Sequence, residues 1–167
     1  DTLAWPPESE SPQATLHVLT IPPGYPLKIA LPATPQTVEQ QTNDALAVIN
    51  GGFFDPATGA AASFVTVEGQ LVADPRDNRR LTENPDLEPY LEQIFNRSEL
   101  RRYRCGDSIR YSITFHQDPV PLACTLHSAL GAGPQLLPQN TSATEGFTAY
   151  QDGELVRDAL GSQGRNA

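Results

Sequence analysis

An apolar run that ends on a pair of glycines constrains this chain most. Residues 45–49 are small or branched and apolar, which is typical of a strand buried on both faces, although so short a run also fits the end of a buried helix. Asn50-Gly51-Gly52 follows, and adjacent glycines permit backbone angles that other residues avoid. Because glycine has no side chain, another group can approach the main-chain N–H groups there. The segment therefore predicts a central strand and then a binding loop, with a tight structural turn as the alternative.

Two aromatic residues and a turn follow the glycine pair. Phe53 and Phe54 place two rings beside the loop, which we call the first glycine loop (residues 50–54). Asp55 opens a turn with the proline after it, so it is both a candidate carboxylate and a candidate cap for its own turn. Residues 55–62, rich in Ala, Gly and Thr, predict a flexible lip loop. Ser63 is a candidate polar contact at the end of that lip loop.

Composition and charge favour one globular domain of short elements. The chain has 167 residues with 16 prolines and 12 glycines, which favours strands joined by loops over a helical bundle. The net charge of −9 argues against a nucleic-acid partner. Ten of the eleven basic residues are Arg, so a bound anion would be held by a planar guanidinium, although compositional bias also explains this usage. No stretch approaches the roughly 20 apolar residues of a membrane span.

The two cysteines and the first residue of the chain indicate the cellular compartment in which we expect the protein. Cys105 and Cys124 predict a disulfide in an oxidising compartment, with two buried thiols in a reducing one as the alternative. The chain starts at Asp1 and contains no Met, and a removed export signal would explain both facts. We therefore expect an exported protein. No pattern has metal-ligand spacing and no cofactor is expected, while a structural calcium stays open.

Periodicity places the expected elements within one domain. Residues 1–13 read as an extended lead-in, and residues 14–167 as the domain. An apolar stripe over residues 87–95 predicts the main helix, which leaves Arg97 to solvent. Positive charge at Arg101, Arg102 and Arg104 then suits the end of that helix. The other expected elements are a short helix at residues 36–43, strands at residues 15–20, 26–31, 64–67, 70–72 and 111–115, and a hairpin around residues 151–153.

Three further places carry candidate functional residues. The polar loop at residues 74–80 is a solvated surface or, if it folds over the first glycine loop, brings Arg79 and Arg80 to a phosphate. His116 is a candidate acid, with a structural role as the alternative. Gly131-Ala132-Gly133-Pro134 is a second glycine loop, which lacks the spacing of a dinucleotide-binding loop.

Taken in order, these motifs resemble the phosphodiester glycosidase domain. The resemblance covers roughly residues 14–167 and rests on Asn50-Gly51-Gly52-Phe53-Phe54-Asp55-Pro56, on the hairpin Val67-Glu68-Gly69-Gln70 and on Gly131-Ala132-Gly133-Pro134-Gln135-Leu136-Leu137. It implies an α+β fold, with a mixed, mainly antiparallel twisted sheet, one long and one short packed helix, and a surface cavity lined by the glycine loops. It also implies hydrolysis of a sugar–phosphate diester in a glycan or cell-envelope polymer.

The resemblance implies that Asn50, Gly51, Gly52, Phe53, Phe54, Gly131, Gly133 and Pro134 line the cavity. From the chemistry we add Asp55 as the candidate carboxylate and His116 as a candidate acid, which with Asn50 form the candidate catalytic set, and Ser63 and Arg79 as candidate substrate contacts. A phosphate leaving group makes a general acid less important. The family continues with an Arg-Thr-Ala-like segment near the end of this chain, so we expect a downstream segment or a second chain to complete the domain. The alternatives are a carbohydrate- or anion-binding module without catalysis, and a structural domain whose glycine loops are only turns.

Overall fold

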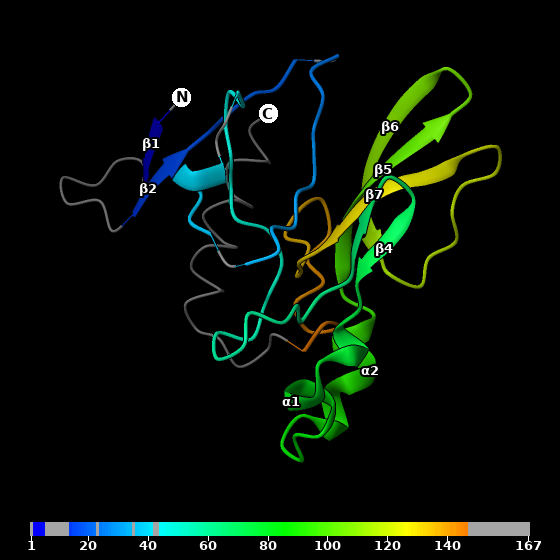
Figure 1. The fold of residues 1–167 in the computed structure, drawn as a ribbon. Coiled ribbons are helices and arrows are strands. Elements are labelled where there is room, and N and C mark those ends of the chain that lie inside the picture. The colour runs from blue at the N-terminus through cyan, green and yellow to red at the C-terminus, as the bar shows by residue number, and fades with distance from the viewer. Residues whose placement is uncertain (1, 6–13, 23, 35, 42–43, 147–167) are drawn as a thin grey trace.

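The computed structural model describes residues 2–5, 14–22, 24–34, 36–41 and 44–146, and the fold is centred on one antiparallel sheet. The sheet has five strands in the order β4-β3-β7-β5-β6 (Figure 1). A separate pair, β1 and β2, is also antiparallel. The α+β class with a mainly antiparallel sheet is thus confirmed. The strands are β1 (Thr2–Trp5), β2 (Ala14–His17), β3 (Val65–Val67), β4 (Gln70–Ala73), β5 (Ser98–Cys105), β6 (Ser108–Phe115) and β7 (Thr125–Gly131).

The helices are short, and α1 and α2 lie together at one end of the sheet (Figure 1). The main predicted helix is confirmed as a 3-10 turn, η3, that continues into α2, with Ile94 buried. The helix predicted at residues 36–43 is reduced to the turn η1. The helical elements are η1 (Glu39–Gln41), η2 (Pro75–Asp77), α1 (Arg79–Thr82), η3 (Glu88–Tyr90) and α2 (Leu91–Phe95). Among the described residues, no helix has the length and apolar character needed to cross a bilayer.

Two predicted hairpins have different outcomes. The β3–β4 hairpin is confirmed, and Glu68 and Gly69 at its turn have φ angles of 51° and 81°. Positive φ at both turn positions matches the right-handed twist of the two strands. The strand predicted at residues 15–20 forms β2, but it pairs with β1 of the lead-in. Residues 26–31 form no strand, and the hairpin predicted around residues 151–153 lies outside the described residues.

The predicted central strand at residues 45–49 is wrong. These residues form no strand, and Leu46 and Ile49 are 86% and 85% exposed. The position beside β3 that a central strand would take is filled by β4 and β7. The centre of the sheet is instead built by β7 and β5, which pair from Glu99 opposite Gly131 to Arg104 opposite Thr125, with a register shift between Arg102 and Tyr103.

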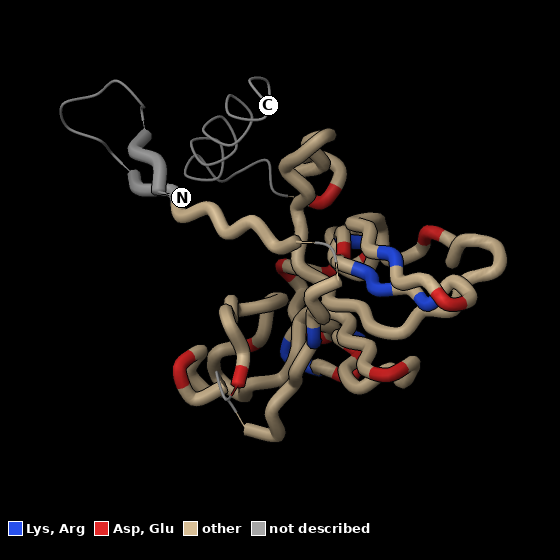
Figure 2. The backbone as a smooth tube through the Cα atoms, turned by 90° about the horizontal axis from the view of Figure 1, so that it is seen from above, with Lys and Arg blue, Asp and Glu red and all other residues tan. Residues whose placement is uncertain are grey.

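Strand β5 replaces the predicted arginine-rich helix end. Its side chains alternate, so that Glu99, Arg101 and Tyr103 are buried on one face. The interpretation of Arg101, Arg102 and Arg104 as charges at a helix terminus is therefore wrong. Basic positions gather in the part of the chain that carries β5 and β6, whereas acidic positions are scattered (Figure 2). This arginine-rich hairpin carries Arg101, Arg102, Arg104 and Arg110.

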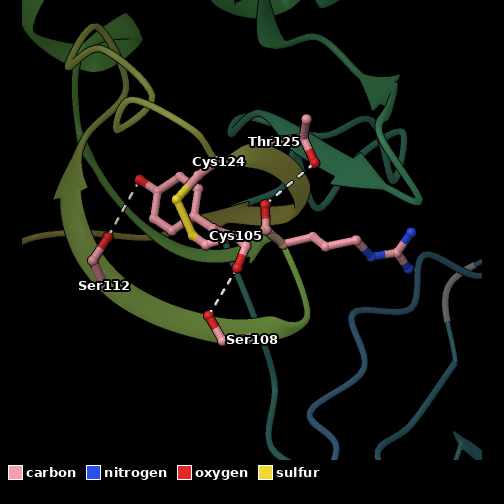
Figure 3. Close-up of a disulfide and its surroundings, with 7 residues drawn as sticks. Cys105, Ser108, Ser112, Cys124 and Thr125 are labelled. Atoms are coloured by element: carbon pink, nitrogen blue, oxygen red, sulfur yellow. Dashed lines mark hydrogen bonds between the residues drawn. A yellow bond between two sulfur atoms is a disulfide. The ribbon is translucent and has the colours of Figure 1, made fainter.

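The predicted disulfide is confirmed and ties two strands of the sheet together. Cys105 at the end of β5 is bonded to Cys124, just before β7 (Figure 3). The Ser108 hydroxyl donates a hydrogen bond to the carbonyl of Cys105 at 2.9 Å, which closes the β5–β6 turn beside the disulfide. The disulfide thus fixes the end of the loop between β6 and β7 to the end of β5.

We expect the double substitution of Cys105 and Cys124 by Ser to lower the free energy of unfolding by about 3 kcal/mol. The bond closes a loop over a sequence separation of 19, and removing it gives that loop entropy back to the unfolded chain. Urea unfolding followed by circular dichroism measures the change. Ser108→Ala is the matched control, since it removes one hydroxyl at the same turn. Equal midpoints for the double variant and the wild type would contradict the prediction.

Candidate functional site

The two glycine loops, far apart in the sequence, meet at their backbones. A Cβ atom placed on Gly52 would overlap the carbonyl oxygen of Gly131 and lie 3.0 Å from the Cβ of Ser63. The N–H of Gly131 donates to the carbonyl of Phe64 at 2.9 Å, which holds the end of β7 against the same segment. Close packing of this kind is possible only because neither glycine has a side chain. The structure thus brings Gly52, Ser63 and Gly131 together.

The lip loop folds back on the first glycine loop as a small irregular hairpin. Phe54 forms an isolated β-bridge with Ala61, and the N–H of Ala62 donates to the carbonyl of Phe53 at 2.8 Å. The buried Ser63 hydroxyl accepts the N–H of Phe53 at 3.2 Å. The rings of Phe53 and Phe54 are nevertheless exposed. The pair therefore offers aromatic surface directly beside the contact between the loops.

Asp55 caps its own turn, as the structural alternative predicts. One carboxylate oxygen accepts the N–H of Ala57 at 2.8 Å, and the other accepts Nε of Arg80 at 2.7 Å. These interactions, the first being the larger, hold the pKa of Asp55 below its ordinary value. Asp55 is therefore ionised at neutral pH and cannot serve there as a proton donor.

We expect the capped turn to make stability sensitive to acid. A lowered pKa in the folded state means that Asp55 contributes stability above its ordinary pKa of 3.8, and that this contribution is lost as pH falls below that value. Urea midpoints measured from about pH 6 to about pH 2.5 should therefore fall less steeply for Asp55→Asn than for the wild type. Asp107→Asn serves as a control in an exposed turn of the β5–β6 hairpin. Parallel curves for Asp55→Asn and the wild type would contradict the prediction.

The two arginines predicted to hold phosphate differ in position. Arg80 reaches the lip loop through its ion pair with Asp55 at 2.7 Å. Arg79 pairs with Glu83 on α1 at 2.7 Å, and both side chains of that pair are exposed. The loop at residues 74–80 thus brings Arg80, and not Arg79, to the lip loop.

Arg97 lies at the contact between the glycine loops, which corrects its predicted exposure to solvent. Its guanidinium carbon is 5.3 Å from the ring centroid of Phe53. Its Cβ is 3.4 Å from the position that a Cβ on Gly133 would take. The backbone between α2 and β5 is fixed there, because the carbonyl of Arg97 accepts the N–H of His116 at 3.2 Å. No helical or strand periodicity at this position signalled the contact.

A buried carboxylate anchors the second glycine loop. Glu145 is 1% exposed, and its oxygens accept the N–H of Ser98 at 2.8 Å and the hydroxyl of Ser98 at 2.5 Å. The Thr141 hydroxyl and the N–H of Gln135 also donate to it. A Cβ on Gly133 would overlap Oε2 of Glu145. Sequence reasoning missed Glu145, because a single Glu in a loop gives no sign that it is buried.

His116 is held in place by Phe64 and by a hydrogen bond with the buried carboxylate of Glu99. Its ring stacks on Phe64 with centroids 3.7 Å apart, and its Nδ1 lies 3.0 Å from Oε2 of Glu99. The side chain of His116 is 32% exposed, whereas that of Glu99 is 2% exposed. A carboxylate at Nδ1 fixes the ring and leaves Nε2 as the other proton-transfer atom. Two contacts link His116 to residues beside the glycine loops. Its ring stacks on Phe64, and its N–H donates to the carbonyl of Arg97.

An open hollow of about 360 Å³ adjoins the lip loop. Its lining comes from the lip loop, from β4 and from the loop after β4, and it includes no residue of either glycine loop. This hollow is therefore not the predicted cavity between the glycine loops. The lining residues are Ala60, Ala61, Leu71, Val72, Ala73, Asp74, Asp77 and Asn78.

The remaining predicted site residues are Asn50, Gly51 and Pro134. Asn50 is exposed at the start of the first glycine loop, and the three atoms nearest to a Cβ on Gly51 would all belong to the Leu130 side chain. Pro134 follows Gly133 in the second glycine loop and is partly buried. No group of three or more His, Cys, Asp or Glu side chains that could hold a metal ion occurs in the part of the chain that the structure describes. Comparisons with protein-family models, with curated proteins and with solved structures found no match to this chain.

Proposed function

We propose that this protein is a hydrolase of the phosphodiester glycosidase type that cleaves a glycosyl phosphodiester in a glycan or cell-envelope polymer. The backbone contact between Gly52 and Gly131 carries the proposal, because it joins the two motifs on which the resemblance rests. Main-chain N–H groups around paired glycines are suited to bind an anion. Arg97 adds a cation and the exposed Phe53 and Phe54 add rings at the same place.

The proposed hydrolysis depends little on a proton donor, because the leaving group is a phosphate. Water attacks the anomeric carbon, the bond from that carbon to the phosphate oxygen breaks, and its electron pair leaves with the phosphate. The proton of the water passes to solvent or to a base. An ionised carboxylate such as Asp55 can stabilise the positive charge that develops on the sugar, and N–H groups and guanidinium can hold the departing phosphate. His116 would accept or donate a proton through Nε2.

We also propose that the protein acts outside the reducing cytoplasm. The Cys105–Cys124 disulfide supports this, since such bonds persist in oxidising compartments. A polymer of the cell envelope would be met in that compartment.

A binding module without catalysis is the second candidate. It is favoured by the state of the two carboxylates near the loops, because glycosidases ordinarily use a pair that faces the substrate. Asp55 is engaged by Ala57 and Arg80, and Glu145 is buried beneath the second glycine loop. Such a module would bind a sugar phosphate and release it unchanged.

The test is hydrolysis of synthetic sugar-1-(methyl phosphate) diesters, in both anomers, in water enriched in oxygen-18. A glycosidase places the label in the released sugar, and a phosphodiesterase that attacks phosphorus places it in the phosphate. Label in the sugar, lost in a variant with Gly52 replaced by Ala, supports the proposal. Label in the phosphate overturns it, as does absence of turnover by this chain. Absence of turnover with retained binding supports the binding module.

A further inference from the structure

We propose that Arg97 is the phosphate-binding residue at the junction of the two glycine loops. The choice of a phosphate ester as ligand rests on the proposed function, whereas the position of the binding group comes from contacts in the fold. Neither the resemblance nor the predicted site included Arg97. Its guanidinium would hold the non-bridging oxygens of a phosphate ester.

The first step of the argument is that Arg97 touches both loops. The guanidinium lies over the ring of Phe53 in the first glycine loop, 5.3 Å from the centroid. The Cβ of the same residue lies beside Gly133 in the second glycine loop, 3.4 Å from where a Cβ there would be. A substituent on Gly133 would therefore push against Arg97. A ligand seated at the contact between the loops is thus within reach of this one side chain.

The second step is that the guanidinium is held in place before a ligand binds. A guanidinium over an aromatic face gains cation–π attraction, which restricts a long and otherwise mobile side chain. The backbone of Arg97 is fixed by the hydrogen bond from the N–H of His116. The next residue, Ser98, is buried and bonded to Glu145 through both its N–H and its hydroxyl. Less conformational freedom is then lost on binding.

The third step is charge. The chain has a net charge of −9, so a phosphate is repelled by the molecule as a whole and needs a local cation. An arginine presents two parallel N–H donors that match two phosphate oxygens, which lysine cannot do.

The experiment titrates the full chain, labelled with nitrogen-15, with inorganic phosphate and with glucose 1-phosphate, and follows the amide signals of Gly52, Gly131 and Gly133. Methyl glucoside is the neutral comparison. We expect Arg97→Gln to weaken binding of both anions at least tenfold, and Arg97→Lys to weaken it less. Arg104→Gln is the matched control, because it removes an exposed charge from the arginine-rich hairpin and should leave the affinity unchanged.

The outcomes separate this proposal from the proposed function. If Arg97→Gln binds both anions as the wild type does, or if Arg104→Gln weakens binding equally, Arg97 is not the phosphate ligand, even where the chain hydrolyses a diester. If phosphate binds through Arg97 but no diester is cleaved, the ligand assignment stands and the hydrolase proposal fails. Absence of phosphate binding to the wild type overturns the assignment. Should Arg97→Gln not fold, Arg97→Lys and Phe53→Leu carry the test, and unchanged affinity in both overturns it.

Discussion

Replacing Arg101 by Met is expected to destabilise the fold by about 3–5 kcal/mol, because it leaves a buried carboxylate without its counter-charge. Arg101 and Glu99 are 3% and 2% exposed, and Nε of Arg101 lies 2.5 Å from Oε1 of Glu99. Met resembles the arginine stem in length and flexibility, so the lost charge and hydrogen bonds dominate the effect. The measurement is the free energy of unfolding in urea at neutral pH.

The expected effect is large because Arg101 bonds to more than Glu99. Its terminal nitrogens donate to the carbonyl of Phe115 at 3.0 Å, of His116 at 2.5 Å and of Asp118 at 2.8 Å. The substitution leaves these part-buried carbonyls without that donor, and an acceptor that is shielded from water and unsatisfied carries its own cost. We therefore expect the turn after β6, and with it His116, to lose its fixed position.

Two controls isolate the ion pair. Arg104→Met makes the same chemical change on the exposed face of β5 and should shift stability by less than about 0.5 kcal/mol. The double variant Glu99→Leu with Arg101→Met removes both charges, and it should cost less than the sum of the two single substitutions. Additive effects of the two single substitutions, or an unfolding free energy for Arg101→Met within error of that for Arg104→Met, would show that the buried pair does not couple the two residues.

The same pair explains why β5 was not predicted from the sequence. The β3–β4 hairpin was predictable, because apolar alternation and a Glu-Gly turn signal agree there. In β5 the inward positions are filled by Glu99, Arg101 and Tyr103, so burial follows charge pairing and not apolar character. Residues 45–49 show the opposite case, because they are apolar and yet form no strand. An apolar run forms a strand only where a neighbouring strand is available, and sequence pattern does not contain that information.

The candidate site was predictable in part for a related reason. Glycine pairs identify where backbone can approach backbone, and the structure does bring Gly52 against Gly131. Arg97 and Glu145 gave no local signal, since their positions follow from how α2, β5 and the segment after β7 pack. Asp55 was predictable both as a cap and as a carboxylate of the site, and its hydrogen bond from Ala57 shows the capping role.

Replacing Gly52 by Ala is expected to separate the glycine loops and to abolish ligand binding at their junction. The added methyl group would overlap the carbonyl oxygen of Gly131 and lie 3.0 Å from both Cβ and Oγ of Ser63. A main-chain carbonyl in a sheet strand cannot rotate away as a side chain does, so the backbone itself has to move. Overpacking of this kind typically costs about 1–3 kcal/mol. We therefore expect a lower urea midpoint, with the loss of function exceeding the loss of stability.

The neighbouring glycine provides the control for this substitution. The three atoms nearest to a methyl group on Gly51 would all belong to the side chain of Leu130, which can change rotamer. Gly51→Ala should therefore fold with near wild-type stability. Hydrogen exchange at the N–H of Gly131, which donates to the carbonyl of Phe64, reports whether the loops have separated, and it should quicken only in Gly52→Ala. If exchange at Gly131 and phosphate affinity stay unchanged in Gly52→Ala, contact between the two loops is not what builds the site.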